Sequence, residues 1–314
     1  MIFIPKPIID ESKILEAARN LIGEDFVNPE IATDGADHIV YKIKTTSLKN
    51  FVIKTGPDAA TDIHVLMKLE RHNFKVPQVL HHTKIQQEDT VYPLFVMTSF
   101  SGTALKDIEP SKKYLYIKLV LDEFKKFRSI KTPARAGYII EVDAGKDWPW
   151  KEFLMRNING ENPAFDWQAV LQHKNIDREL LKKAMKQAEK KISTLGDNLE
   201  LSLLHTDVNE ANIFVKEEQL EGIIDWSDAK YGDWIFDFAR FRMNIRHRMD
   251  DAALKEYSSG IQFSDAERQR ERIYYLLNVL DYTNWYVVYG WDEMVTIQMD
   301  LLREIQREFA TQLK

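Results

Sequence analysis

The alternation of apolar and polar positions predicts a strand-rich first hundred residues. A helix is predicted over residues 11–22, with Ser12 as its candidate N-terminal cap. Short apolar stretches separated by turn-forming residues follow, and they predict strands on both sides of an Asp34-Gly35 turn, at 51–55, and near 76–82 and 92–102. A second helix is predicted at about 61–72.

From Leu105 onward, apolar residues recur at the spacing of amphipathic helices. Two such stripes run from 117 to 127 and from 181 to 195, and an irregular segment rich in Gly, Trp and Pro lies between them at 131–168. Further helices are predicted near 234–248, 264–288 and 291–312. We therefore predict an α+β fold with a small, mostly β lobe at residues 1–100 and a larger, mostly helical lobe at 101–314.

Composition narrows the functional classes. The net charge of −6 and the lack of any basic run argue against nucleic acid as the main partner. The chain has no cysteine, which excludes disulfides, thiolate metal sites and a cysteine nucleophile. The start MIFIPKPIIDESK does not read as a secretory signal, and no 18 apolar residues run together, so we expect a cytoplasmic protein without a membrane span. The oligomeric state stays open.

The stretch 203–226, LLHTDVNEANIFVKEEQLEGIIDW, carries the strongest chemical signal. His205, Asp207 and Asn212 have the H-x-D-x-x-x-x-N spacing of a kinase-type catalytic loop. Residues 213–215 predict a strand, 216–219 a polar turn and 220–224 the returning strand. This hairpin is expected to bring Asn212 and Asp225 side by side.

The residue types suit phosphoryl transfer. Mg²⁺ prefers oxygen ligands and keeps several waters, so Asn212 and Asp225 beside nucleotide phosphates suffice to bind it. Asp207 is then available to orient the acceptor hydroxyl and accept its proton, and it is the predicted catalytic residue. His205 is expected to be structural, holding the loop backbone.

Two segments, HTDVNEANIFV and IIDWSDAKYGDWIFDFA, are similar to the paired signature of the aminoglycoside phosphotransferase family, in which Trp follows the second acid. A looser match, GYIIEVDAGKDWPWKEFL at 137–154, resembles hygromycin-type members. The resemblance implies a protein-kinase-like, two-lobed fold and transfer of a phosphoryl group from ATP or GTP, with Mg²⁺, to a small-molecule hydroxyl. It also implies that Asp237 anchors the catalytic loop, and Asp233 is expected to be structural.

The same resemblance assigns phosphate-binding residues in the first lobe. Lys54 lies in the strand that matches the family's phosphate-pairing lysine, with Lys42 and Lys44 as competing candidates and an edge-strand lysine as the plain alternative. Asp62 is the candidate ion-pair partner of Lys54, although the family more often has Glu there. Gly35 marks the candidate phosphate-covering loop, or else an ordinary turn. The hinge between lobes is expected near 97–101.

The acceptor is less well defined. Many enzymes of this type act on cationic amino sugars, and an acidic pocket attracts such amines. Asp281, Asp292 and Glu293 lie beside four aromatic residues between 285 and 291, and we expect an acidic and aromatic wall there, or else solvated helix faces. An aminoglycoside-type antibiotic is the leading acceptor, with antibiotic resistance as its consequence. A metabolite such as an amino alcohol, homoserine or a sugar is the alternative.

Two other functional classes fit part of this pattern. A non-haem iron enzyme could use His205, Asp207 and a distant histidine such as His247, but this leaves Asn212 and Asp225 unexplained. A non-catalytic nucleotide-binding scaffold is the other alternative, because a fold does not fix a function.

Overall fold

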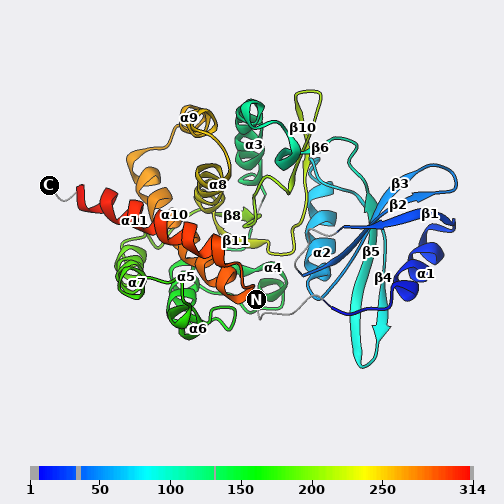
Figure 1. Ribbon diagram of the computed structural model, residues 1–314, viewed down its shortest axis with the longest axis horizontal. Helices are drawn as coiled ribbons and strands as arrows, with labels where there is room; N and C mark the ends of the chain where they lie inside the picture. Colours follow the sequence, from blue (N-terminus) through cyan, green and yellow to red (C-terminus); the bar gives the residue numbers. More distant parts are fainter. Residues whose placement is uncertain (1–6, 33–36, 131, 312–314) are drawn as a thin grey trace. The chain divides into compact units, whose positions relative to one another are not determined.

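The computed structural model describes residues 7–32, 37–130 and 132–311, and these form two compact units (Figure 1). The N-terminal unit comprises the described residues up to Glu109 together with Asn209–Ala229. The C-terminal unit comprises Pro110–Val208 and the described residues from Lys230 onward. The predicted α+β class is confirmed by the element order. The predicted lobe boundary at residue 100 differs from these units, because a late hairpin folds with the N-terminal unit.

The core of the N-terminal unit is an antiparallel sheet with strand order β1-β2-β3-β5-β4. The strands are β1 (Phe26–Ile31), β2 (Ile39–Thr45), β3 (Asn50–Thr55), β4 (Val79–Gln87) and β5 (Thr90–Thr98). Helix α1 (Glu11–Ile22) packs on one face, and Ile53 belongs to the apolar cluster beneath it. Successive side chains of a strand point to opposite faces. Lys54 therefore points to the other face, where α2 (Ala59–Glu70) lies (Figure 1).

A second, small sheet explains why residues 209–229 belong to the N-terminal unit. It has the order β10-β9-β6 and consists of β6 (Thr103–Ala104), β9 (Ile213–Lys216) and β10 (Gln219–Ile223). The predicted hairpin is thus present, and its two turn residues, Glu217 and Glu218, both have positive φ, as tight hairpin turns require. Because β6 pairs with β9, residues 101–109 stay with the hairpin. A short 3₁₀ helix, η1 (Leu105–Asp107), follows β6.

Helix α1 has the predicted bounds but a different cap. The Asp10 carboxylate accepts the Ser12 backbone N–H at 2.9 Å, and the helix ends at Gly23 with φ of 74°. The prediction of Ser12 as the cap is therefore wrong. Asp10 stands immediately before the helix, where a side-chain oxygen can reach the free amides of the first turn.

The C-terminal unit is mostly helical, with a small antiparallel sheet of order β7-β11-β8. Its strands are β7 (Gly137–Tyr138), β8 (Leu201–Leu204) and β11 (Lys230–Asp233). Its helices are η2 (Pro110–Lys112), α3 (Tyr114–Phe127), α4 (Ile139–Asp143), α5 (Trp150–Ile158), α6 (Trp167–Gln172), α7 (Arg178–Ile192), α8 (Ile235–Arg248), α9 (Asp251–Gly260), α10 (Asp265–Val288) and α11 (Asp292–Thr311). Helices α7, α8, α10 and α11 pack around one large apolar cluster.

The helices predicted after residue 234 match α8, α10 and α11 to within one residue at each end. The segment at 131–168 is more regular than expected. It contains β7, α4 and α5, and Trp150, Phe153 and Leu154 of α5 are buried in the main core. Their spacing is that of a helix face, which the surrounding Gly and Pro residues obscured.

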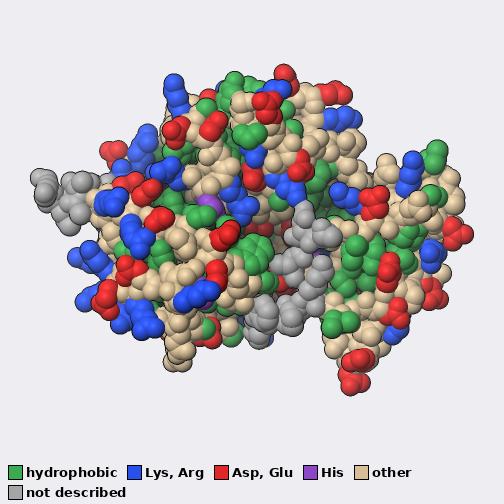
Figure 2. All heavy atoms as spheres, in the orientation of Figure 1, with side chains coloured by type: hydrophobic (Ala, Val, Ile, Leu, Met, Phe, Trp, Pro, Cys, Tyr) green, Lys and Arg blue, Asp and Glu red, His purple; other side chains and the backbone are tan. Residues whose placement is uncertain are grey.

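Charged side chains are well mixed on the surface. On the face drawn in Figure 2, Lys and Arg side chains alternate with Asp and Glu side chains, without a broad region of one sign. Among the helices that the structure describes, none is both long and apolar enough to cross a membrane.

Candidate active site

In the N-terminal unit, Lys54 is held between two carboxylates. Its side chain is 4% exposed, and its Nζ lies 2.5 Å from Asp62 Oδ2 of α2 and 2.8 Å from Asp225 Oδ1. Burial alone lowers the pKa of Lys54, but the charges of Asp225 and Asp62 outweigh it and hold this pKa above its ordinary value. The competing candidates, Lys42 and Lys44, are exposed on β2.

Asp225 adopts an unusual backbone conformation. Its φ is 65°, a left-handed value that is uncommon and costs energy for a residue other than glycine. Burial opposes its ionisation, yet the charges of Lys54 and His38 hold the pKa of Asp225 well below its usual range. The Ser227 hydroxyl also donates to Asp225 Oδ1 at 2.8 Å. The carboxylate is therefore charged and fixed.

Asp62 links α2 to this turn as well as to Lys54. One oxygen approaches Lys54, and the other accepts the backbone N–H of Trp226 at 2.7 Å. The Trp226 ring is fully buried, and its Nε1–H donates to the Ile223 carbonyl at 3.2 Å. The shorter side chain of Asp, compared with Glu, is thus accommodated because the Asp225-Trp226 turn comes up to α2.

The hairpin places Asn212 and Asp225 on neighbouring chain segments. Beyond the last paired residues of β9 and β10, the Ile224 N–H donates to the Asn212 carbonyl at 2.9 Å. One carboxylate and one amide are suitable oxygen ligands for Mg²⁺ when phosphate oxygens and water complete the shell. The described residues contain no group of three His, Cys, Asp or Glu that could hold a metal by themselves. The donor set therefore fits a metal bound together with a nucleotide, and it gives no support to the iron-site alternative.

In the C-terminal unit, the loop that carries Asp207 is fixed through its backbone. The Asp237 carboxylate accepts the N–H groups of His205 at 2.7 Å and Thr206 at 2.9 Å. His205 Nδ1 in turn accepts the N–H of Asp207 at 3.2 Å. Thr206 has φ of 62°, so this loop, like the Asp225 turn, contains a strained residue. These contacts agree with the structural roles expected for His205 and Asp237.

Asp233 is also held within the fold. Its carboxylate accepts the Tyr274 hydroxyl at 2.7 Å, and it lies 2.7 Å from Arg270. The expected structural role is thus consistent with its contacts. Gly35, the remaining predicted phosphate-binding residue, lies outside the described residues.

Two residues near Asp207 were not anticipated from the sequence. The Tyr282 hydroxyl of α10 donates to Asp207 Oδ1 at 2.8 Å. Arg240 of α8 lies over the Tyr282 ring, with its Cζ 4.3 Å from the ring centroid, and it forms an ion pair with Asp281. No sequence motif signals these contacts. Only the adjacency of Asp281 and Tyr282 in an aromatic-rich helix hinted at them.

An aromatic cluster continues from Tyr282. The Tyr282 ring lies 6.3 Å from that of Trp285, which lies 4.3 Å from Tyr289 and 4.9 Å from Trp291. We define this aromatic cluster as Tyr282, Trp285, Tyr286, Tyr289 and Trp291. Trp291 is 43% exposed, so the cluster reaches the surface.

The expected acidic wall stays a prediction, and two of its three acids have cationic neighbours. Asp281 is paired with Arg240, and Asp292 lies 2.9 Å from His173 and 2.5 Å from Lys174. Both acids already have a cationic partner, which reduces the attraction that they can exert on a charged ligand. Two acids of the predicted wall, Asp281 and Asp292, are therefore already compensated.

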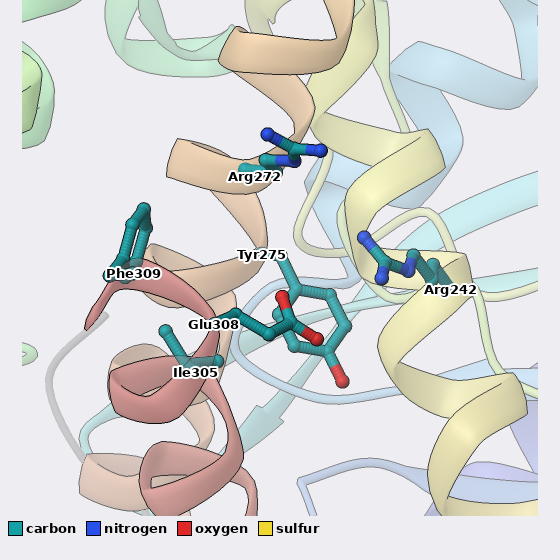
Figure 3. Close-up of a pocket in the computed structure, with 6 residues that line it drawn as sticks. All are labelled: Arg242, Arg272, Tyr275, Ile305, Glu308 and Phe309. Atoms are coloured by element: carbon teal, nitrogen blue, oxygen red, sulfur yellow. The ribbon is translucent and has the colours of Figure 1, made fainter. Parts of the chain in front are cut away.

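A separate hollow lies between α8, α10 and α11 (Figure 3). Its lining residues are Arg242, Arg272, Tyr275, Ile305, Glu308 and Phe309. Arg242 is two positions from Arg240 along α8, so the two point in different directions from the helix. Arg242 is also paired with Glu271 at 3.0 Å. The hollow is thus distinct from the surroundings of Asp207.

Comparison with known proteins gives a consistent result. The model of the phosphotransferase enzyme family matches residues 30–274. No protein of curated function matches the sequence significantly.

Solved structures show a similar fold. Aminoglycoside phosphotransferase APH(4)-Ia, in a ternary complex with ADP and hygromycin B, is 15% identical, with a TM-score of 0.74 over 94% of this chain and 98% of that one. Amicoumacin kinase hAmiN, in complex with AMP-PNP, Ca²⁺ and Ami, is 13% identical, with a TM-score of 0.66 over 96% and 94%. A microcompartment-associated aminopropanol kinase is 12% identical, with a TM-score of 0.66 over 93% and 98%. At these identities the likeness establishes the protein-kinase-like fold.

Proposed function

Because this chain belongs to the phosphotransferase enzyme family, we propose that it transfers the γ-phosphoryl group of ATP to a hydroxyl of a small molecule. GTP is the alternative donor. The main support is the buried contact of Lys54 with Asp62 and Asp225. A strand lysine held by an acid of the following helix is the arrangement that kinases use to aim a lysine at the nucleotide phosphates.

The roles of the N-terminal unit follow from its charges. Lys54 neutralises the α- and β-phosphates, and Asp62 keeps its ammonium group in place. Asn212 and Asp225 hold Mg²⁺, which when bound offsets the negative charge of the phosphate oxygens. The low pKa of Asp225 keeps its carboxylate ionised at neutral pH, as a metal ligand must be.

Asp207 handles the acceptor. Its carboxylate accepts the hydrogen bond of the acceptor hydroxyl and orients the oxygen toward the γ-phosphorus. As the new oxygen–phosphorus bond forms, the bond from the γ-phosphorus to the oxygen bridging to the β-phosphate breaks, and ADP leaves. The hydroxyl proton passes to Asp207. The well-anchored loop around Thr206 keeps the backbone of Asp207 in position for this step.

The aromatic cluster favours an acceptor that contains sugar or cyclitol rings, because the C–H faces of such rings pack well on Trp and Tyr. We therefore propose an aminocyclitol-type antibiotic as the leading acceptor class, as in the hygromycin B complex of the similar fold. In this proposal the amino groups contribute less than the ring faces, since Asp281 and Asp292 already have cationic partners. The reaction would take place in the cytoplasm, where ATP is abundant.

A small amino alcohol or another metabolite is the second candidate. The compensated charges of the wall favour it, because they do not select a multiply charged ligand. A kinase of aminopropanol shares the fold.

The decisive experiment measures ADP release with Mg²⁺ and ATP across aminocyclitol antibiotics and amino alcohols, with Asp207→Asn as the blank. The leading proposal expects stimulation by an aminocyclitol, loss of that stimulation in the blank, and reduced drug susceptibility of cells that express the protein. Stimulation by an amino alcohol alone would transfer the assignment to the metabolite candidate. Mg-ATP binding without stimulation by any acceptor would instead favour a scaffold.

A further inference from the structure

The carboxylate of Asp207 has a second source of order besides its backbone. The contacts of Asp237 and His205 are made with the main chain of the loop and do not involve the Asp207 carboxylate. The hydrogen bond from Tyr282 at 2.8 Å restricts the rotation of that carboxylate. A proton acceptor must point in one direction to work efficiently, so this bond bears directly on the chemistry.

Tyr282 itself is held by a buried ion pair. Arg240 is only 3% exposed, and its guanidinium lies against the Tyr282 ring while it pairs with Asp281, the neighbouring residue on α10. A planar guanidinium can stack on an aromatic ring and bind a carboxylate at the same time. Arg240 therefore fixes the ring of Tyr282 from α8, and Asp281 fixes Arg240.

We propose that Tyr282 is a positioning residue for phosphoryl transfer, orienting the Asp207 carboxylate toward the acceptor hydroxyl, and that Arg240 and Asp281 hold Tyr282 in place. This inference rests on the proposed function, since it concerns the residue that accepts the acceptor's proton. The contact would keep its donor character at neutral pH, because burial and the nearby Asp207 charge raise the pKa of Tyr282 well above its ordinary value. A protonated phenol gives a hydrogen bond to a carboxylate without competing for the acceptor's proton.

The competing explanation is purely structural. A partly buried tyrosine needs a hydrogen-bond partner, and Asp207 could serve only to satisfy it. The two explanations differ in what the hydroxyl does for turnover. If Tyr282 positions Asp207, removing the hydroxyl slows the chemical step and leaves substrate binding intact. If it only satisfies a partner, its removal leaves turnover unchanged.

The test compares Tyr282→Phe with Tyr275→Phe. Tyr275 is also on α10 and nearly buried, but it lines the separate hollow of Figure 3. Tyr282→Phe is expected to lower kcat by about tenfold to a hundredfold, the range for a hydrogen bond to a charged group, with the KM values of ATP and acceptor within about twofold. Tyr275→Phe is expected to leave all three constants unchanged. Equal losses in both variants, or a rise in acceptor KM without a fall in kcat, would overturn the proposal.

A second measurement does not depend on turnover. In protein labelled with ¹³C at the aspartate carboxyl carbons, the Asp207→Asn variant identifies the Asp207 signal. Tyr282→Phe is expected to shift that signal and Tyr275→Phe to leave it in place. Failure of Tyr282→Phe to shift it refutes the positioning contact, whatever the activity. If the signal shifts but the wild-type protein phosphorylates no acceptor, the proposed function fails, and the positioning role falls with it.

Arg240→Lys and Arg240→Met test the support of Tyr282. Lysine keeps a positive charge beside the ring and methionine does not. We expect Arg240→Lys to retain a larger share of kcat than Arg240→Met, with both keeping the KM for ATP. Equal activity of the two variants would contradict the role of the Arg240 charge.

Discussion

The two parts of the proposed site are held by different kinds of interaction. In the N-terminal unit, the buried ammonium of Lys54 lies between the carboxyl groups of Asp62, which is buried, and Asp225, whose side chain is 37% exposed. In the C-terminal unit, the Asp207 carboxylate accepts a hydrogen bond from the neutral Tyr282 hydroxyl, and its backbone N–H donates to His205 Nδ1. The groups that would meet a highly charged nucleotide are thus fixed by charged partners, whereas the carboxylate that would take up a proton is contacted by a neutral hydroxyl.

Removal of the cation at Lys54 is expected to have the largest effect on stability. Lys54→Met leaves Asp62 and Asp225 without their buried counter-ion, and it is expected to reduce the free energy of unfolding by about 3–5 kcal/mol. Urea denaturation followed by circular dichroism measures this. Lys42→Met is the control, because Lys42 is exposed on the neighbouring strand and its replacement should change stability by less than about 0.5 kcal/mol. Equal effects of the two variants would show that the charge network does not stabilise the unit.

The N-terminal unit also contains the parts of the site that could be predicted from the sequence. Asn212 and Asp225 flank the hairpin of β9 and β10, and local turn and strand patterns were enough to predict that they lie close together. Lys54 and Asp62 are separated by one turn and part of a helix. Their pairing was expected from the family resemblance, which places a phosphate-pairing lysine in this strand and an acid near the start of the following helix.

The surroundings of Asp207 could not be predicted in this way. Arg240 lies on α8 and Tyr282 on α10, both distant from the catalytic loop in the sequence. Their contact depends on how these two helices pack against each other. Helical periodicity identifies the buried face of each helix but not which residue lies opposite which. For the same reason, Asp281 was assigned to an acidic wall, although its carboxylate is turned toward Arg240.

A smaller effect is expected at the anchor of the catalytic loop. Asp237→Asn retains one acceptor oxygen and puts an N–H₂ donor against a backbone N–H, so one of two buried amides loses its partner. We expect the free energy of unfolding to fall by about 1–3 kcal/mol, as measured by thermal unfolding. We also expect a lower kcat, as measured by ADP release.

Asp177→Asn provides a matched control for that variant. Asp177 caps α7 by accepting the Leu180 N–H at 3.1 Å, and Asn caps helices about as well as Asp. The same chemical change should therefore leave both stability and kcat nearly unaffected. If Asp237→Asn behaved like Asp177→Asn, the loop geometry would not depend on the two amide contacts.

The aromatic cluster should affect the acceptor and not the nucleotide. Trp291→Ala removes an exposed ring that packs against Trp285 and Tyr286, and it is expected to raise acceptor KM by about threefold to tenfold, matching the worth of one aromatic contact. The KM for ATP should stay constant. Tyr114→Ala, at another partly exposed aromatic, serves as the control and should change neither value. A similar rise in the KM values of ATP and acceptor in Trp291→Ala would show that the aromatic cluster does not bind the acceptor specifically.

The smallest effect is expected for Asp292→Asn. The change in acceptor KM in this variant shows whether charge or ring packing selects the acceptor. Asp292 is partly exposed and lies between His173 and Lys174, so its charge is already compensated and partly screened by water. Asp292→Asn should leave the KM of a multiply charged aminocyclitol within about twofold, because exposed ion pairs contribute less than about 1 kcal/mol. Comparing this acceptor with its N-acetylated, neutral counterpart makes the measurement specific for charge. A rise in KM for the charged compound alone would restore an acidic acceptor wall, and the C-terminal unit would then use full charges much as the N-terminal unit does.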